Sequence, residues 1–420
     1  MKVLIVGGGG REHAIASALL RDERVSELVC APGNGGIAKL ARCVPVKATD
    51  IEGQVALALE EKPDLVVVAP DDPLAMGLVD RLTENGIRAF GPNAAAAQIE
   101  ASKSFAKSLM EKYGIPTAAC GVFDDAESAR AYVKEKGAPI VVKADGLALG
   151  KGVTVASTVE EALEAVDSAF GGAFGAAGSR VVIEECLFGP EVSMLCFTDG
   201  KSIKTMVPSQ DHKRVFDGDK GPNTGGMGAV SPVPCYTEEI HDRCVKEIFE
   251  PTVAAMNAEG CTFKGVLYCG LMLTENGPKV IEYNCRFGDP ETQVVLPRLE
   301  SSLLEIMLAI TEERLSEVDV VWDKGACVTV VLASGGYPGK YQTGFEISGI
   351  EEAEKAGGLV FHAGTKSGEN GAVLTSGGRV LAVSAKADDL DSALANAYAA
   401  AEKIDFEGKH FRTDIGCHAK

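Results

Sequence analysis

The sequence lacks long apolar runs, which limits where the protein can act. No stretch approaches the ~18 consecutive apolar residues that a membrane-spanning helix needs. The first residues, MKVLIVGGGG, hold about five apolar residues before the glycines, too few for the core of a signal peptide. We therefore expect a cytoplasmic protein with no membrane partner.

The sequence also lacks paired cysteine motifs and an excess of basic residues. None of the 12 cysteines belongs to a CxxC pair, so neither a zinc site of paired cysteines nor a dithiol redox motif is expected. With 41 Lys and Arg against 60 Asp and Glu, the formal net charge is -19, which repels the phosphate backbone of nucleic acids. We expect no nucleic-acid partner. A small anionic substrate is compatible with this charge if the cations gather in a cleft.

Three widespread catalytic motifs are absent as well. The dinucleotide fingerprint G-x-G-x-x-G fails in both frames, because Glu12 or His13 stands where the third glycine should be. In GLALGKGV, at residues 146–153, Gly152 stands where a P-loop needs Ser or Thr for magnesium. No G-x-S-x-G elbow or cysteine–histidine nucleophile pattern occurs. A hydrolase with a covalent intermediate is therefore disfavoured, and a dehydrogenase is left as a weak alternative that NAD binding would test.

The apolar pattern predicts several domains. Alternating strand and helix signals up to about residue 95 predict a parallel sheet with crossover helices. One strong helix is expected over 94–113, ended by Gly114. Residues 210–232 have no apolar periodicity, and a loop of this length is expected to shape a ligand site. A small α+β unit is expected from about Gly325. Further expected elements are helices over 159–170, 238–259 and 302–311 and a surface loop over 171–179.

The most informative segment is KVIEYNCRFGDPETQ, residues 279–293. Glu282, Asn284 and Arg286 are spaced by two, so they share one face at the end of a predicted strand. Carboxylate and amide oxygens suit Mg²⁺, and a guanidinium offers a planar fork to an anion. The Gly-Asp-Pro turn would hold Asp289 near Arg286. A strand end with solvated polar residues is the alternative interpretation.

Two glycine-rich turns are candidates for phosphate binding. At the first turn, Gly8, Gly10 and Arg11 precede a helix whose N-terminus favours anions, although the glycines would equally serve close packing. The second, at 146–152, is predicted to be a mobile hairpin that folds over phosphates. Lys143 follows an apolar run just before it, which favours pairing with phosphate over a snorkelling position.

Two further segments carry weaker signals. Glu184 and Glu185 close a predicted strand, where an exposed backbone could read an adenine edge and a carboxylate could bind ribose hydroxyls. Asp211 and His212 lie in the long predicted loop, without the spacing of metal ligands or of a nucleophile. His212 is expected to orient or hydrogen-bond other groups, with a purely structural role as the alternative.

Together these segments resemble the ATP-grasp superfamily and, within it, the phosphoribosylamine–glycine ligase family. The resemblance covers nearly the whole chain, and the segments PSQDHKR and RFGDPETQ are its most specific parts. The other matching segments, in order, are GGGGREHA, PGNGG, GPNAAAAQIEASKSFAK, VVKADGLALGKGV and the terminal FRTDIG.

The resemblance implies a multidomain fold of the α/β and α+β classes. We expect an N-terminal parallel-sheet, Rossmann-like substrate-binding domain at 1–102 and a two-part ATP-grasp domain at 103–324. Residues 118–190 or so would form a mobile subdomain that covers ATP, and 325–420 a small C-terminal α+β domain.

The resemblance also implies the reaction. ATP, 5-phosphoribosylamine and glycine would give glycinamide ribonucleotide, ADP and phosphate through a glycyl-phosphate intermediate, in de novo purine biosynthesis. ATP and Mg²⁺ or Mn²⁺ are the expected cofactors, and the enzyme is expected to be a monomer or weak homodimer. Because the strand before the Glu-x-Asn pair, GVLYCGLML, has no acid, a second metal would need ATP oxygens or a loop residue such as Asp217.

The roles that the resemblance implies fall into five groups. ATP would contact Lys103, Lys143, Gly150, Gly152, Glu184, Glu185, Leu187 and Glu191; the metal Glu282 and Asn284; the reacting groups Arg286, Asp211, His212 and Lys213; the ribose phosphate Gly8, Gly10 and Arg11; and the remaining substrate atoms Asp289 and Pro290. Two alternatives stay open: another ATP-grasp enzyme that activates a carboxylate or bicarbonate, and a nucleotide-sensing protein without turnover.

Overall fold

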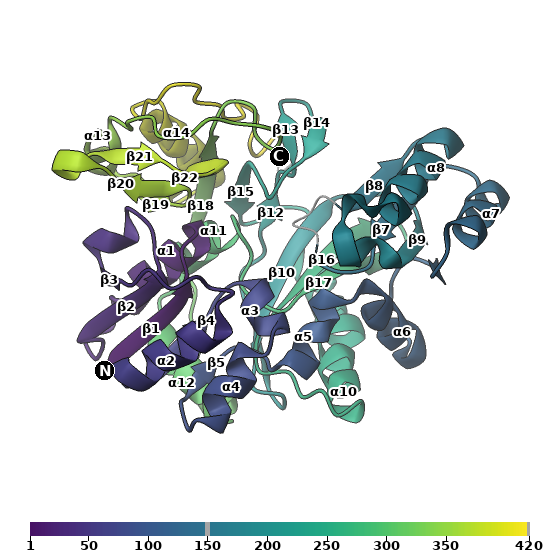
Figure 1. The fold of residues 1–420 in the computed structure, drawn as a ribbon, viewed down its shortest axis with the longest axis horizontal. Coiled ribbons are helices and arrows are strands. Elements are labelled where there is room, and N and C mark those ends of the chain that lie inside the picture. The colour runs from purple at the N-terminus through teal and green to yellow at the C-terminus, as the bar shows by residue number, and fades with distance from the viewer. Residues whose placement is uncertain (148–151, 418–420) are drawn as a thin grey trace.

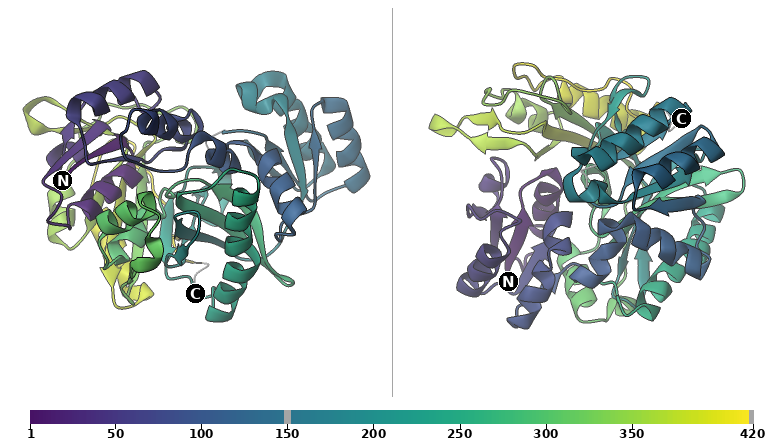
Figure 2. Two further views of the ribbon diagram at one scale, coloured as in Figure 1. Left: turned by 90° about the horizontal axis from the view of Figure 1, so that it is seen from below. Right: turned by 45° about the vertical axis from the view of Figure 1, so that its right-hand side comes forward.

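In the computed structural model, which describes residues 1–147 and 152–417, four sheets and two small hairpins build one body with a projecting unit (Figure 1). The N-terminal sheet and the C-terminal sheet lie side by side (Figure 2), and helix α1, labelled in Figure 1, contacts β1 of the first and β19 of the second. No helix in the described ranges is long and apolar enough to cross a membrane.

The N-terminal sheet is parallel, with the strand order β3-β2-β1-β4-β5, as expected from the alternation of strands and helices. Its central strand, β1, has no exposed apolar side chain from Val3 to Val6, because helices cover both faces. The strands are β1 (Lys2–Gly7), β2 (Glu27–Pro32), β3 (Arg42–Cys43), β4 (Leu65–Val68) and β5 (Ala89–Phe90). The helices are α1 (Gly10–Leu19), α2 (Ile51–Glu61), α3 (Asp71–Ala75), α4 (Leu78–Glu84) and the 3₁₀ turn η1 (Ile37–Lys39).

The helix expected over 94–113 is two helices, so that prediction was wrong at its centre. α5 (Ala94–Ala101) and α6 (Lys103–Tyr113) are separated by Ser102, whose φ of -135° and ψ of 108° are extended. The Ser102 hydroxyl accepts the N–H of Phe105 at 3.1 Å, so it caps α6. A serine that can cap a new helix competes with helix continuation, and here the cap prevails. Lys103 therefore begins α6, while Gly114 ends it as expected.

The projecting unit has its own antiparallel sheet, in the order β6-β9-β7-β8, and its own apolar core. It consists of β6 (Cys120–Phe123), α7 (Ala126–Lys136), β7 (Ile140–Ala144), β8 (Val153–Ala156), α8 (Val159–Ser168) and β9 (Val181–Glu185). The loop expected over 171–179 is largely wound into a π turn, η2 (Ala169–Ala173), and a 3₁₀ turn, η3 (Gly175–Ser179). Glycine and alanine adopt these tight turns without side-chain clashes.

The central sheet is antiparallel, in the order β11-β10-β16-β17, and carries the segment of greatest interest at the end of β17. Its strands are β10 (Glu191–Thr198), β11 (Ile203–Thr205), β16 (Gly265–Thr274) and β17 (Gly277–Asn284). The accompanying helices and turns are α9 (Glu238–Cys244), η4 (Val245–Phe249), α10 (Glu250–Ala258), α11 (Thr292–Val295), η5 (Leu296–Arg298), α12 (Leu303–Thr311) and η6 (Leu315–Glu317). The helix expected over 238–259 is present, but it contains a π turn at η4.

The long loop expected over 210–232 is instead four short strands. β12 and β15 join the C-terminal sheet, whose order is β12-β15-β18-β22-β19, and β13 pairs with β14 in a hairpin. Because β15 pairs with β18, about a hundred residues later, no local apolar pattern could reveal it. The strands are β12 (Gln210–Asp211), β13 (Arg214–Phe216), β14 (Lys220–Asn223), β15 (Gly228–Ser231), β18 (Ala326–Ala333), β19 (Leu359–His362), β20 (Thr365–Ser367), β21 (Val373–Thr375) and β22 (Arg379–Ala387). The helices and the 3₁₀ turn are α13 (Ile350–Lys355), η7 (Glu369–Gly371) and α14 (Leu390–Ala401).

Candidate active site

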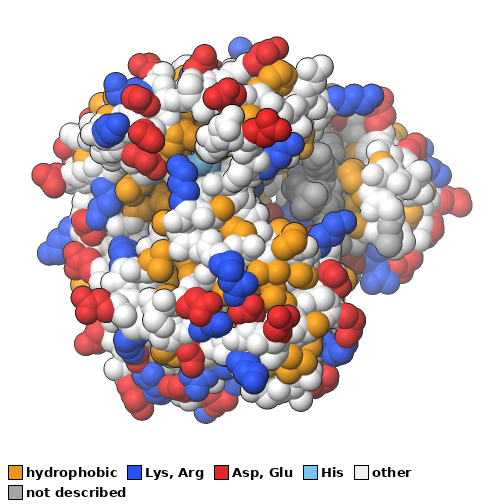
Figure 3. Space-filling model, turned by 60° about the vertical axis from the view of Figure 1, so that its left-hand side comes forward, with side chains coloured by type: hydrophobic (Ala, Val, Ile, Leu, Met, Phe, Trp, Pro, Cys, Tyr) orange, Lys and Arg blue, Asp and Glu red, His pale blue; other side chains and the backbone are white. Residues whose placement is uncertain are grey.

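Glu282 and Asn284 lie at the end of β17, and Arg286 follows two residues later. A hollow separates the projecting unit from the body (Figure 3). A bulge in the pairing with β16 falls immediately before them, because Gly270 opposes Glu282 while Leu271 opposes Val280. Bulges re-aim side chains and are frequent next to active sites. Arg286 donates to the Asn284 Oδ1 at 3.1 Å, so these two side chains meet on one face.

Three lysines from different elements gather around Glu282. The Lys213 ammonium lies 3.2 Å from the Glu282 carboxylate and also pairs with Glu191. Lys143 donates to the backbone carbonyl of Ile281, in the bulge, at 2.7 Å. Lys213, and then Lys143 and Lys103, lower the pKa of Glu282 to about 2 although its partial burial opposes the charge. The carboxylate is therefore ionised at neutral pH and surrounded by positive charge suited to a polyphosphate.

The donor set at this edge suits a hard divalent ion. Glu282 and Asn284 offer carboxylate and amide oxygens from one face, and the Glu282 side chain is 37% exposed and so within reach of a ligand. In the part of the chain that the structure describes, no group of three or more His, Cys, Asp or Glu residues could enclose a metal. Mg²⁺ commonly takes one or two protein ligands and fills its shell with phosphate and water oxygens. The residues present therefore fit an ion shared with a nucleotide.

Asp217 is engaged elsewhere. Its carboxylate accepts the backbone N–H of Thr413 at 2.8 Å and the Thr413 hydroxyl. The suggestion that Asp217 could hold a second metal therefore finds no support in these contacts.

Glu184 and Glu185, at the end of β9, point to opposite faces of the sheet. Glu184 lies between Lys143, at 2.9 Å, and Lys107, at 3.3 Å, and all three side chains are nearly buried. Glu185 instead accepts the N–H of Ala119 and pairs with Lys279, each at 3.1 Å. Only Glu184 is therefore brought together with Lys143. No local pattern indicated Lys107, which lies within α6.

The other predicted nucleotide contacts come from several elements. Lys103 donates to the carbonyl of Gly146 at 2.8 Å, and burial lowers its pKa. Leu187 lies between β9 and β10, and Gly152 directly precedes β8. Gly150 lies outside the described residues.

Arg286 is held by an acid that sequence reasoning missed. Glu100, on α5, lies 2.8 Å from the guanidinium, and its other oxygen accepts the N–H of Cys285 at 2.7 Å. Burial alone would lower the pKa of Arg286, but Glu100 and Asp71 outweigh it and raise the pKa. Glu100 lies almost 200 residues earlier in the chain, so only the fold shows the pair.

Lys213 reaches the central sheet, where its ammonium pairs with Glu191 and Glu282, whereas His212 contacts Gly416 near the end of the chain. Burial and the nearby carboxylate of Glu291 raise the pKa of Asp211 well above its usual range. Glu291 in turn accepts the hydroxyls of Ser193 and Tyr268, each at 3.0 Å. Glu291 lies within the PETQ segment, and that segment was the signal that could have identified it.

His212 is a hydrogen-bonding residue in this structure. Its Nε2 accepts the N–H of Gly416 at 2.9 Å, and burial lowers its pKa to about 4. The side chain is not brought together with Glu282. The ring thus accepts a backbone hydrogen bond, and the orienting role of His212 stays a prediction.

The first glycine turn is packed tightly against its surroundings. A Cβ on Gly8 would lie 2.4 Å from the carbonyl oxygen of Gly33, and one on Gly10 2.6 Å from the Gln293 amide. Arg11 is buried, paired with Glu12 at 2.8 Å and donating to a backbone carbonyl. Close packing therefore accounts for both glycines, and the anion cradle finds no separate support here.

Asp289 lies beside this glycine turn, together with two further residues. Gln293 donates to Asp289 at 2.8 Å, and the guanidinium of Arg379 lies 3.4 Å from the carboxylate. Arg379 also donates to the carbonyls of Asp289 and Gly225, so β22 of the C-terminal sheet reaches the site. Pro290 packs against Gly226, next to Asp211. Nothing local in the sequence indicated Arg379.

Family models match the chain in three consecutive parts. They describe the N domain of phosphoribosylglycinamide synthetase at residues 1–100, its ATP-grasp (A) domain at 101–292 and its C domain at 327–418.

Relatives and solved structures resemble the chain over nearly its full length. A phosphoribosylamine–glycine ligase of Nostoc sp. is 53% identical over 420 residues, covering 99% of each chain. One from Brucella melitensis is 50% identical and covers 100% of this chain and 98% of the relative.

The crystal structure of phosphoribosylamine–glycine ligase from Thermotoga maritima aligns with a TM-score of 0.86 at 35% identity, covering 99% of this chain and 100% of that one. A biotin carboxylase domain from Hydrogenobacter thermophilus, in complex with MgADP and bicarbonate, aligns with a TM-score of 0.74 over 98% of this chain and 91% of that one. At 18% identity this second likeness shows the fold alone.

Proposed function

The chain belongs to the phosphoribosylamine–glycine ligase family of ATP-grasp enzymes, and from this premise we propose that phosphate passes from ATP to glycine beside Glu282, Asn284 and Arg286. The enzyme joins glycine to 5-phosphoribosylamine with ATP in de novo purine biosynthesis. One observation carries the proposed site: an ionised carboxylate, an amide oxygen and a guanidinium share a strand end that lysines surround.

The chemistry needs an activated carboxyl group, because a carboxylate is a poor electrophile. In the proposed first step, a glycine carboxylate oxygen attacks the γ-phosphorus of ATP and ADP leaves, giving glycyl phosphate. The amine of phosphoribosylamine then attacks the carbonyl carbon, loses a proton, and phosphate departs with one former glycine oxygen. Both steps bring anions together, so catalysis depends on positioning and charge neutralisation.

Each member of the strand end has a distinct proposed task. Glu282 and Asn284 would hold Mg²⁺, or Mn²⁺, which when bound neutralises the nucleotide phosphates. Arg286, fixed by Glu100, would orient toward the acyl phosphate and neutralise the charge that develops on it. Lys213, whose ammonium lies 3.2 Å from the Glu282 carboxylate, would neutralise charge in the same region.

We assign the nucleotide to the hollow beside the projecting unit. Lys103 and Lys143 would contact the phosphates, and Gly150 and Gly152 are predicted to contact them as well. Support comes from the position of both lysines near Glu282, whose pKa they help to lower. Glu184, Glu185, Leu187 and Glu191 would bind adenine and ribose. Among these, Glu185 has the weakest support because it faces away from Lys143.

The two other substrates would bind between the central and C-terminal sheets. Asp211 and Lys213 would contact glycine and the amine, with His212 supporting their backbone. Asp289 and Pro290 would contact phosphoribosylamine, and its phosphate would approach the turn Gly8–Arg11. Support for Asp289 comes from its place beside that turn, next to the guanidinium of Arg379.

Several expectations stay predictions. They are a cytoplasmic location, a monomer or weak homodimer, the absence of nucleic-acid and membrane partners, and domain boundaries at 1–102, 103–324 and 325–420 with a mobile subdomain near 118–190.

Isotope transfer tests the proposed chemistry. With [carboxyl-¹⁸O₂]glycine, ATP, Mg²⁺ and phosphoribosylamine, we expect one ¹⁸O in each released phosphate and one in the product amide. A parallel reaction with bicarbonate and aminoimidazole ribotide should release no phosphate. Phosphate without ¹⁸O, or turnover only in the bicarbonate reaction, would overturn the proposal in favour of another ATP-grasp activity.

A further inference from the structure

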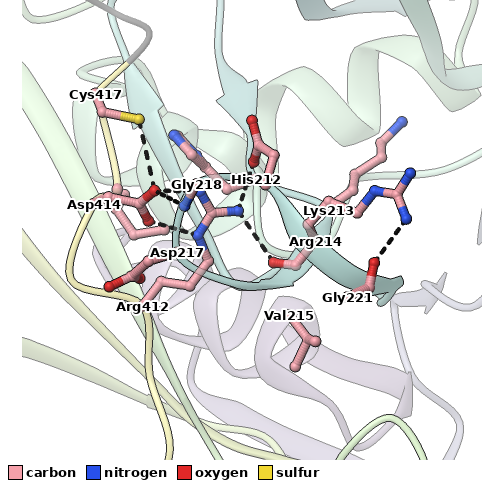
Figure 4. A network of polar contacts seen from close by, with 12 residues as sticks. His212, Lys213, Arg214, Val215, Asp217, Gly218, Gly221, Arg412, Asp414 and Cys417 are labelled. Carbon is pink, nitrogen blue, oxygen red and sulfur yellow. Dashed lines mark hydrogen bonds and ion pairs between the residues drawn. The ribbon is translucent and has the colours of Figure 1, made fainter.

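The last described residues of the chain contact the segment that carries Lys213 almost residue by residue (Figure 4). We name residues 410–416 the tail clip, and residues 212–224, which include the hairpin β13–β14, the clipped segment. His410 and Thr413 contact the hairpin near its turn: the His410 Nε2 lies 2.8 Å from the carbonyl of Val215, and Thr413 donates twice to Asp217.

Arg412 is the centre of the tail clip. Its side chain is 0% exposed, and its guanidinium binds both oxygens of Asp414, at 2.7 and 2.9 Å. The same guanidinium donates to the carbonyl of Arg214 at 3.1 Å and pairs with Asp219 at 2.8 Å. The Asp414 carboxylate also accepts the N–H of Gly218 at 2.8 Å. A buried bidentate pair of this kind has one geometry, so it holds the hairpin backbone in a defined place.

The first residues of the clipped segment, His212 and Lys213, belong to the proposed active site. Gly416 donates to the ring of His212, and the carbonyl of Lys213 accepts both the N–H and the hydroxyl of Thr224, each at 2.8 Å. The backbone on both sides of Lys213 is therefore fixed, while its ammonium spans Glu191 and Glu282.

From these contacts we propose that the tail clip is a positioning element, in which Arg412 and Asp414 hold the clipped segment so that Lys213 reaches Glu282. Arg412 and Asp414 act on the backbone of the clipped segment, at the carbonyl of Arg214 and the N–H of Gly218. The inference rests on the proposed function of Lys213. It gives the C-terminal residues a specific effect on the step that involves glycine.

The test compares two clip variants with Lys213→Met. Asp414→Asn weakens the buried network around Arg412. Thr413→Val removes only the hydroxyl contact with Asp217, so this milder variant carries the test if Asp414→Asn does not fold. Glu351→Gln, which removes an exposed ion pair on α13 of the same domain, is the matched control. For each variant, kcat and KM for glycine, the Kd for ADP and the thermal midpoint are measured.

We expect Asp414→Asn to lower kcat/KM for glycine about tenfold, because small misplacements of catalytic groups cost one to two orders of magnitude. Its Kd for ADP should stay within about twofold of the parent, and Thr413→Val should show a smaller loss of the same kind. The double variant Asp414→Asn/Lys213→Met should be no worse than Lys213→Met alone, because the clip acts through Lys213. If the tail clip had a merely structural role, the losses in kcat/KM of the two single variants would multiply in the double variant. Asp414→Asn would then also weaken ADP binding as much as it weakens the use of glycine.

Two outcomes separate the inference from its premise. The tail clip does not position Lys213 if Lys213→Met is impaired while both clip variants match Glu351→Gln. The same conclusion follows if the losses in kcat/KM multiply in the double variant. In both cases only the inference about the tail clip fails. If Lys213→Met itself keeps the parent kcat/KM, the proposed role of Lys213 fails and the inference fails with it.

Discussion

The buried pair of Glu100 and Arg286 allows a quantitative prediction. Glu100→Gln keeps the volume of the side chain but removes the charge that lies 2.8 Å from the guanidinium. The Glu100 and Arg286 side chains are 6% and 18% exposed, so water cannot replace the lost charge. The glutamine amide must also turn an N–H₂ group toward either Arg286 or the backbone N–H of Cys285, which are both donors.

We expect Glu100→Gln to cost about 3 kcal/mol of stability. Removing one partner of a buried pair costs about 3–5 kcal/mol, and the low end applies because Asp71 still faces Arg286. The thermal midpoint should fall by about 3 °C, because the unfolding entropy of a chain of this length is large. Because Arg286 loses its anchor, kcat/KM for glycine should fall about 100-fold.

Calorimetry and a coupled ADP assay measure the two effects of Glu100→Gln. Glu60→Gln, at an exposed position on α2, is the control and should change neither. If Glu100→Gln keeps the parent midpoint and kcat/KM, then Glu100 does not hold Arg286, and our explanation of its position is wrong.

Two predictions concern pH. Lys213→Met should raise the pKa of Glu282, because Lys213 is the largest cause of the low value. Ionised Glu282 is lost as pH falls through its folded pKa, so the acid limb of Mn²⁺ binding should move to higher pH; an unmoved limb would refute this. Burial lowers the pKa of His13 to about 4 and of His362 to about 3, so each binds a proton near pH 6.5 only when unfolded. Stability should therefore fall by about 2 kcal/mol per histidine between pH 7 and pH 5. In His13→Asn, the amide oxygen can still accept the backbone N–H of His362. Urea titrations at pH 7 and pH 5 should show that the variant loses about 2 kcal/mol less stability on acidification than the parent does. An equal pH dependence in variant and parent would contradict this.

Local rules were sufficient for the parts of the site that lie on one element. The apolar run from Val3 to Val6 with its glycine turn predicted a buried parallel strand and a helix, and both are present. The spacing of Asn284 and Arg286 predicted a shared strand face, and their side chains touch. Alternation along a strand depends only on backbone geometry, so it can be read without knowing the fold.

Partners that meet only after folding could not be predicted. Arg379 reaches Asp289 from a strand 90 residues later, and Glu100 reaches Arg286 from a helix in the first part of the chain. The segment 210–232 has no apolar period because its strands are completed by residues far along the chain. Ser102 shows a local competition, since a capping serine within a strong helix pattern divided the helix.

The most direct test of the active-site assignment is Mn²⁺ binding in the presence of ADP, measured by electron paramagnetic resonance. Glu282→Gln removes the charged ligand, and Glu275→Gln, exposed in the turn of the same β16–β17 pair, is the control. We predict that Glu282→Gln weakens Mn²⁺ binding more than about 100-fold, while Glu275→Gln matches the parent. Equal Mn²⁺ affinity in Glu282→Gln and the parent would contradict a metal site at the end of β17.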